Sequence, residues 1–121
     1  MELGLTNKVT LITGGSSGIG LSAAKLFAKE GARVLIAARR PAVLQQAVEE
    51  IYQEQGDTVD TISVDVTSID DLDRLKGYVR ERFGRIDILV NNAGTGTYKP
   101  FLEVTDEELL NGMAINFFAQ F

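Results

Sequence analysis

A glycine-rich turn near the N-terminus has the residue types and spacing to bind phosphate. Residues 13–20 read TGGSSGIG and lie between a short β-branched run and a stretch with helical spacing. Gly14 permits a sharp turn out of a strand, and Gly18 has no side chain to keep a phosphate from the next helix. Free amides and the helix dipole favour an anion there, and the hydroxyls of Ser16 and Ser17 add donors. The turn therefore predicts a diphosphate site.

The same turn must also pack against the elements that hold it. Gly20 leaves room for the following helix to approach the sheet, and Ile19, Ala23, Leu26 and Phe27 share the apolar face expected to pack there. A turn needed only for this packing is the alternative interpretation. The position of the glycine-rich turn between a strand and a helix of a βαβ unit favours phosphate binding.

Strands and helices are expected to alternate along the rest of the chain. Continuous apolar runs predict strands over residues 8–13, 33–38, 59–66 and 86–90. Helical spacing predicts helices over residues 17–30, 41–56, 68–83 and from 105 onward. This alternation predicts an α/β fold of the Rossmann type, a doubly wound parallel sheet that is incomplete, with about four strands in the order 3-2-1-4.

Two motifs together resemble the short-chain dehydrogenase/reductase family. The turn has the spacing G-x-x-x-G-x-G after Thr13, and Asn91-Asn92-Ala93-Gly94 follows the fourth expected strand. The resemblance covers the whole chain and implies one cofactor-binding domain over residues 1–121. It implies hydride transfer between a nicotinamide dinucleotide and an alcohol/carbonyl substrate, with Asn92, Ala93 and Gly94 beside the adenosine ribose. For Asn91, hydrogen bonding to neighbouring backbone at a strand end has equal weight.

The residues after the second expected strand bear on the choice of cofactor. NAD-binding units carry a carboxylate there, about twenty residues beyond the glycine turn, which binds the ribose hydroxyls. This chain has Ala37-Ala38-Arg39-Arg40 instead. By resemblance, Ala38 occupies the acidic position, Arg39 contacts the 2′-phosphate of NADP and Arg40 assists, as suits a guanidinium. We therefore expect NADP rather than NAD; the alternative is that both arginines only solvate a loop.

The end of the third expected strand holds another pair of candidate residues. By resemblance, Asp65 and Val66 occupy the position that contacts adenine. An aspartate there can also cap a turn or a helix, and the two roles are compatible. Ser68 and Asp71 are spaced as a capping box for the helix that follows.

The catalytic set of the family is only partly represented. It comprises an asparagine, a serine, and a tyrosine and lysine spaced Y-x-x-x-K, with the tyrosine as acid and base. By position, Asn116 matches the asparagine, and a packing role is its alternative. The residues four positions after the three tyrosines are Gly56, Arg82 and Leu102, none of them lysine.

We therefore expect a truncated N-terminal portion of the enzyme that binds cofactor without turnover. A non-catalytic nucleotide-binding module and an interaction fragment are the alternatives.

Composition excludes several other classes of protein. The 121 residues suffice for one domain. Without cysteine or histidine, the chain has no disulfide, no thiolate or imidazole zinc site and no histidine base. A net charge of −5 without a basic stripe argues against nucleic-acid binding. With no apolar run of about 20 residues and no signal-like N-terminus, we expect a cytoplasmic protein without a membrane partner.

The C-terminal segment predicts self-association. Residues 113–121 read MAINFFAQF, which is apolar on more than one side of a helix. In related enzymes the matching helix lies at a subunit interface, and the fourth strand lacks a neighbour on one edge. The expected assembly is a homo-oligomer.

Overall fold

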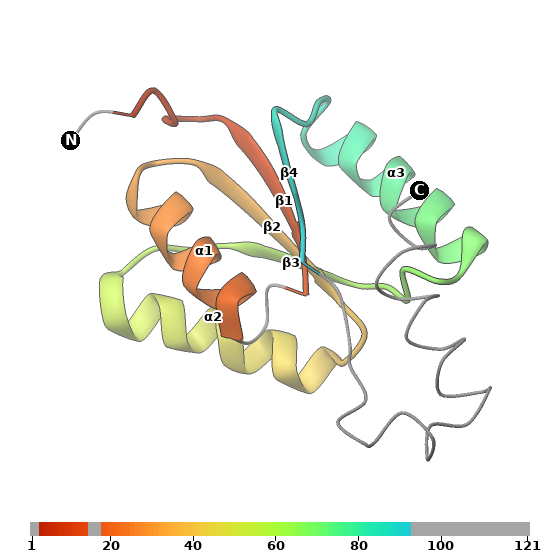
Figure 1. Ribbon diagram of the computed structural model, residues 1–121, viewed down its shortest axis with the longest axis horizontal. Helices are drawn as coiled ribbons and strands as arrows, with labels where there is room; N and C mark the ends of the chain where they lie inside the picture. Colours follow the sequence, from red (N-terminus) through yellow and green to blue (C-terminus); the bar gives the residue numbers. More distant parts are fainter. Residues whose placement is uncertain (1–2, 15–17, 93–121) are drawn as a thin grey trace, which may run out of the picture.

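The computed structural model describes residues 3–14 and 18–92 and shows a parallel sheet with helices on both faces (Figure 1). The strands are β1 (Val9–Thr13), β2 (Arg33–Ala38), β3 (Asp60–Ser63) and β4 (Ile88–Asn91). The helices are α1 (Gly18–Lys29), α2 (Pro41–Gln55) and α3 (Ile69–Arg82). The strand order is β3-β2-β1-β4, and every pair is parallel. The predicted fold class and strand order are confirmed.

The sheet is covered on both faces, and the side chains of β2 alternate between two cores. Leu35 and Ala37 pack beneath α3, whereas Val34 and Ile36 pack beneath α1 and α2. Figure 1 shows the same division, with α1 and α2 on one side of the strands and α3 on the other. Because successive side chains of a strand point to opposite faces and both faces of this sheet are covered, this strand is a continuous apolar run.

Helix α1 packs through a different stripe from the one predicted. Its buried residues are Gly20, Ala24 and Ala28. Ile19 and Leu26 are 82% and 65% exposed, so their predicted core positions are wrong, whereas Ala23 and Phe27 are partly buried against the core. The helix turns its smallest side chains to the sheet, because this lets the two backbones approach closely. Apolar residues occupy neighbouring stripes of α1, and the larger ones are not those facing inward.

The expected third and fourth strands differ at their ends from those observed. β3 stops at Ser63, so Asp65 and Val66 lie in the connection to α3 and not in a strand. The Asp65 amide donates to the carboxylate of Asp71 at 2.8 Å, which takes it out of strand pairing. β4 begins at Ile88, two residues later than the predicted start at 86.

The helix ends agree with the predicted capping residues. Arg40 is extended, with φ −99° and ψ 110°, as a residue before proline must be, and α2 begins at Pro41. The Asp71 amide donates to Ser68 Oγ at 3.2 Å, which caps α3.

Within the described residues, no helix has the length and apolar character needed to cross a membrane. The expected helix from residue 105 and the apolar segment 113–121 lie outside the described residues.

Asp87 joins the starts of β1 and β4. Its Oδ2 accepts from the Val9 amide at 2.8 Å and from Arg85 Nε at 2.9 Å. Both hydrogen bonds hold the pKa of the Asp87 carboxyl below its ordinary value, and the one from the Val9 amide has the larger effect. The ionised carboxylate therefore supports the pairing of these two strands.

We predict that Asp87 contributes to acid sensitivity. A carboxyl with a lowered pKa in the fold stabilises it above the unfolded pKa of about 3.9, and this stability is lost as pH falls through the folded pKa. Asp87→Asn should therefore flatten the decline in unfolding free energy between about pH 5 and pH 2, measured by urea titration. Asp73→Asn, at an exposed position of α3, is the matched control. An acid slope equal to that of the wild type would contradict the prediction.

The packing of α1 gives a second prediction. Ala24 is fully buried, so Ala24→Leu should lower the unfolding free energy by about 1–3 kcal/mol through overpacking. Leu26→Ala, at an exposed position of the same helix, should change it by no more than about 0.5 kcal/mol. Chemical denaturation of both variants measures this. A larger loss from Leu26→Ala would show that the stripe predicted from the sequence faces the sheet.

Candidate functional site

The carboxyl ends of all four strands meet at one edge of the sheet, because the strands are parallel. Gly14 follows β1, Arg39 follows β2, Asp65 lies beyond β3 and Asn92 follows β4. The structure thus brings together residues that are up to 78 positions apart in the sequence. Ligands of open α/β sheets bind outside this edge, where connections to either side of the central strand diverge.

The start of the glycine-rich turn is held by the strands on both sides of β1. The Asn92 amide donates to Thr13 Oγ1 at 3.0 Å, and Asn92 Nδ2 donates to the Gly14 carbonyl at 3.2 Å. On the other side, the Gly14 amide donates to the Ala37 carbonyl at 2.8 Å. Gly14 has a φ of +68°, a conformation that side chains disfavour. The turn therefore leaves β1 in a fixed direction.

The beginning of α1 is open and suited to an anion. Gly18 has a φ of +57°, and within the described part of the chain a Cβ added there would meet nothing within 4 Å. The first amides of a helix have no partner within it, and the first turn of α1 carries no acidic residue. These features fit the diphosphate of a dinucleotide. Gly20 is buried, whereas the adjacent Ile19 is exposed.

The connection from β2 to α2 consists of two exposed arginines, Arg39 and Arg40. Ala38, which precedes them, is half-buried and carries no charge. The edge of the sheet at this connection therefore presents cationic side chains, which suit a phosphate better than ribose hydroxyls.

The Asp65 carboxylate forms a turn before α3. Its Oδ1 accepts from the hydroxyl of Thr67 at 2.6 Å and from the Thr67 amide at 2.9 Å. The pKa of Asp65 is held below its ordinary value, most strongly by the hydrogen bond from the Thr67 hydroxyl and then by that from the Thr67 amide. The nearby Arg39 guanidinium lowers it further. The structure thus shows the turn-forming role that the sequence left open. Val66 packs against the core beneath α3.

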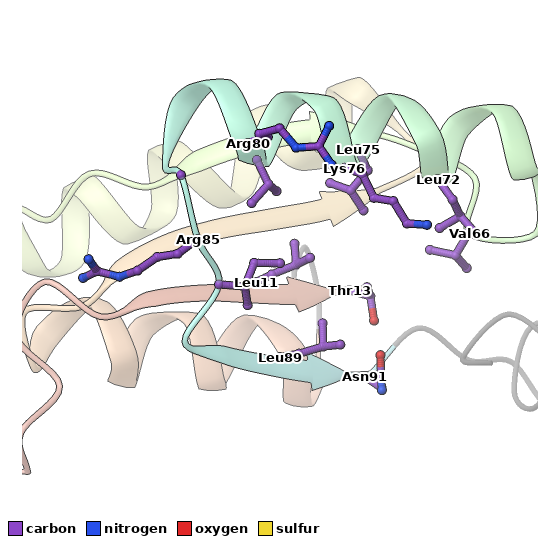
Figure 2. A pocket seen from close by; sticks show the side chains of 13 residues that line it. Leu11, Thr13, Val66, Leu72, Leu75, Lys76, Arg80, Arg85, Leu89 and Asn91 are labelled. Carbon is purple, nitrogen blue, oxygen red and sulfur yellow. The ribbon is translucent and has the colours of Figure 1, made fainter.

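A groove of about 490 Å³ lies between α3 and the face formed by β1 and β4. Figure 2 shows Leu11, Leu75 and Leu89 in its apolar part, with Lys76 and Arg80 reaching over it from α3. The groove meets the carboxyl edge at Thr13 and Asn91. It is on the face of the sheet away from α1 and is distinct from the glycine-rich turn.

Five predicted site residues lie outside the described residues: Ser16, Ser17, Ala93, Gly94 and Asn116. Other polar residues at the site were not predicted. The hydroxyls of Thr13 and Thr67 fix the glycine turn and the Asp65 turn, and Ser63 Oγ donates to the Arg39 carbonyl at 2.8 Å. Their only sequence signal is a small hydroxyl residue at or just after a strand end. Within residues 3–14 and 18–92, no cluster of three or more acidic side chains could hold a metal ion.

Comparison with known proteins places this geometry in a family. The sequence model of short chain dehydrogenases matches residues 8–121. The hydroxynaphthalene reductase-like protein Arp2 of Metarhizium robertsii is 39% identical over 120 residues, which cover 97% of this chain and 44% of that protein. The chain thus spans less than half the length of this curated relative.

Solved structures of other proteins resemble this chain in both fold and sequence. The L-sorbose reductase of Gluconobacter frateurii, complexed with NADPH and L-sorbose, matches with a TM-score of 0.88 and 40% identity, over 99% of this chain and 46% of that one. An alcohol dehydrogenase of the archaeon Thermococcus sibiricus, complexed with 5-hydroxy-NADP, gives a TM-score of 0.83 and 35% identity over 93% and 48% of the two chains. This chain therefore belongs to the short chain dehydrogenase family.

Proposed function

We propose that this chain is the cofactor-binding part, over residues 1–121, of an NADP-dependent oxidoreductase acting on an alcohol/carbonyl pair. The observation that carries the choice of cofactor is the arginine pair at the end of β2, where the carboxylate of an NAD site is replaced by Ala38. NADPH and 5-hydroxy-NADP are the ligands of the two structural neighbours, which supports this choice.

The proposed contacts divide the cofactor among the strand ends. Gly14, Gly18 and the amides that begin α1 receive the diphosphate, together with Ser16, Ser17, Ile19 and Gly20. Arg39 and Arg40 take the 2′-phosphate. Asp65 and Val66 contact adenine, and Asn92, Ala93 and Gly94 form the wall beside its ribose.

The bound cofactor would supply the hydride chemistry, and this chain would hold and orient it. Asn116 is the proposed anchor of the family's proton-relay water. The tyrosine and lysine that would move a proton have no counterpart in these 121 residues. A small alcohol/carbonyl substrate, a homo-oligomeric assembly and a cytoplasmic location belong to the same proposal, without a nucleic-acid or membrane partner.

Substitution at the arginine pair tests the cofactor assignment. Arg39→Ala should weaken NADPH binding by about 1.5–3 kcal/mol, equivalent to roughly 10–150-fold, because a charge-assisted phosphate contact is lost. NADH binding should change by less than about 2-fold, since NADH lacks the 2′-phosphate. Isothermal titration with both cofactors measures the two constants.

Two further variants sharpen that test. Arg80→Ala removes an exposed arginine of α3 and should leave the ratio of the two constants unchanged. Ala38→Asp should shift the preference towards NADH by restoring the ribose-binding carboxylate. Equal losses of both cofactors in Arg39→Ala would refute the assignment to NADP.

A second candidate function is cofactor binding without turnover, and the absence of any Y-x-x-x-K spacing among the 121 residues favours it for this chain. We predict that the purified chain binds NADPH but does not oxidise it above background with a panel of ketones and aldehydes, because no acid or base is positioned. Absorbance at the nicotinamide band follows the reaction. Cofactor-dependent turnover by the pure chain would contradict the prediction.

A further inference from the structure

The connector between β2 and α2 is held at three successive carbonyl groups. The carbonyls of Ala38 and Arg40 accept from backbone amides, one just after β3 at 2.9 Å and one in α2 at 3.1 Å. The carbonyl of Arg39 accepts from the side chain of Ser63 at 2.8 Å. The two outer hydrogen bonds form with almost any residue type, whereas the middle one depends on a single hydroxyl.

Ser63 is itself fixed on both sides. It pairs with Ala38 in the parallel register of β2 and β3, so its side chain stands beside the start of the connector. The guanidinium of Arg74, on α3, donates to the Ser63 carbonyl and pairs with Asp71 at 3.5 Å. The Asp71 carboxylate in turn accepts from the Asp65 amide at 2.8 Å. A polar network thus runs from α3 through the end of β3 to the arginine connector.

We propose that Ser63 is a positioning residue for discrimination between NADP and NAD. Its hydroxyl fixes the backbone of Arg39, so that the guanidinium is held at the carboxyl edge where a 2′-phosphate would lie. This inference rests on the proposed function of Arg39. A long side chain on a fixed backbone reaches fewer positions, and preorganised donors bind with less loss of entropy.

A positioning role differs from a purely structural one in its selectivity. NADH has no 2′-phosphate and gains nothing from an oriented Arg39, so loss of the Ser63 hydroxyl should affect only NADPH. A structural role would weaken both cofactors together, because the adenosine pocket as a whole would deform. The ratio of the two dissociation constants is therefore the informative quantity.

The experiment measures NADPH and NADH dissociation constants for this chain by isothermal titration. Ser63→Ala should raise the NADPH constant by about 2–10-fold, the range for one hydrogen bond, and the NADH constant by less than about 2-fold. Ser63→Cys, a near-isosteric weak donor, should behave like Ser63→Ala, and Ser63→Thr should restore the wild-type ratio. Thr61→Val removes a hydroxyl two residues earlier on the same strand and should leave the ratio unchanged.

A double-variant cycle connects the effect to Arg39. In an Arg39→Ala background, adding Ser63→Ala should leave the ratio unchanged, because no guanidinium remains to be positioned. The inference is overturned if Ser63→Ala weakens both cofactors equally, leaves NADPH binding intact, or shifts the ratio as much without Arg39. If Arg39→Ala is itself unselective, the NADP assignment fails and the role of Ser63 fails with it. A selective Arg39→Ala beside an unselective Ser63→Ala rejects the inference alone.

Discussion

The parallel pairing of β1 between β2 and β4 is the constraint on which the site depends. Thr13 is the partner of Ala37 on one side and of Asn91 on the other, so the glycine-rich turn emerges level with both neighbouring strand ends. A slip of one residue would turn the side chains of β1 to the wrong cores and move the turn away from Asn92. The two cores and the hydrogen bonds of Gly14 therefore select the same register.

The fold was largely predictable from the sequence because its strongest signals are local. The apolar run of β2 and the proline and serine at the starts of α2 and α3 marked their elements correctly. The end of β3 was not predictable, because the Asp65 amide is diverted by a side chain six residues away. The inward stripe of α1 was missed because close approach to the sheet selects alanine over the larger Leu26.

Residues of the candidate site could be predicted only where a sequence motif falls at the end of a predicted strand. Gly14 and Arg39 directly follow strand ends that the sequence marks clearly, and Gly18 begins the helix after β1, so their gathering at one edge follows from a parallel sheet. The contact of Ser63 with Arg39 joins residues 24 positions apart and requires the register of β2 with β3. Asp65 shows the same limit, since its residue type suited either a turn or a ligand and its partner Thr67 establishes the turn.

The two hydrogen bonds from Asn92 have a consequence for the order in which the chain is made. The glycine-rich segment is synthesised early, but its anchors at Thr13 and Gly14 are completed by a residue 78 or more positions later. A nascent chain that has passed α3 but lacks β4 can form the Gly14–Ala37 hydrogen bond on one side of β1, but not the two hydrogen bonds from Asn92 on the other side. The turn that we propose to bind a dinucleotide is therefore held on both sides only after β4 has left the ribosome and docked beside β1.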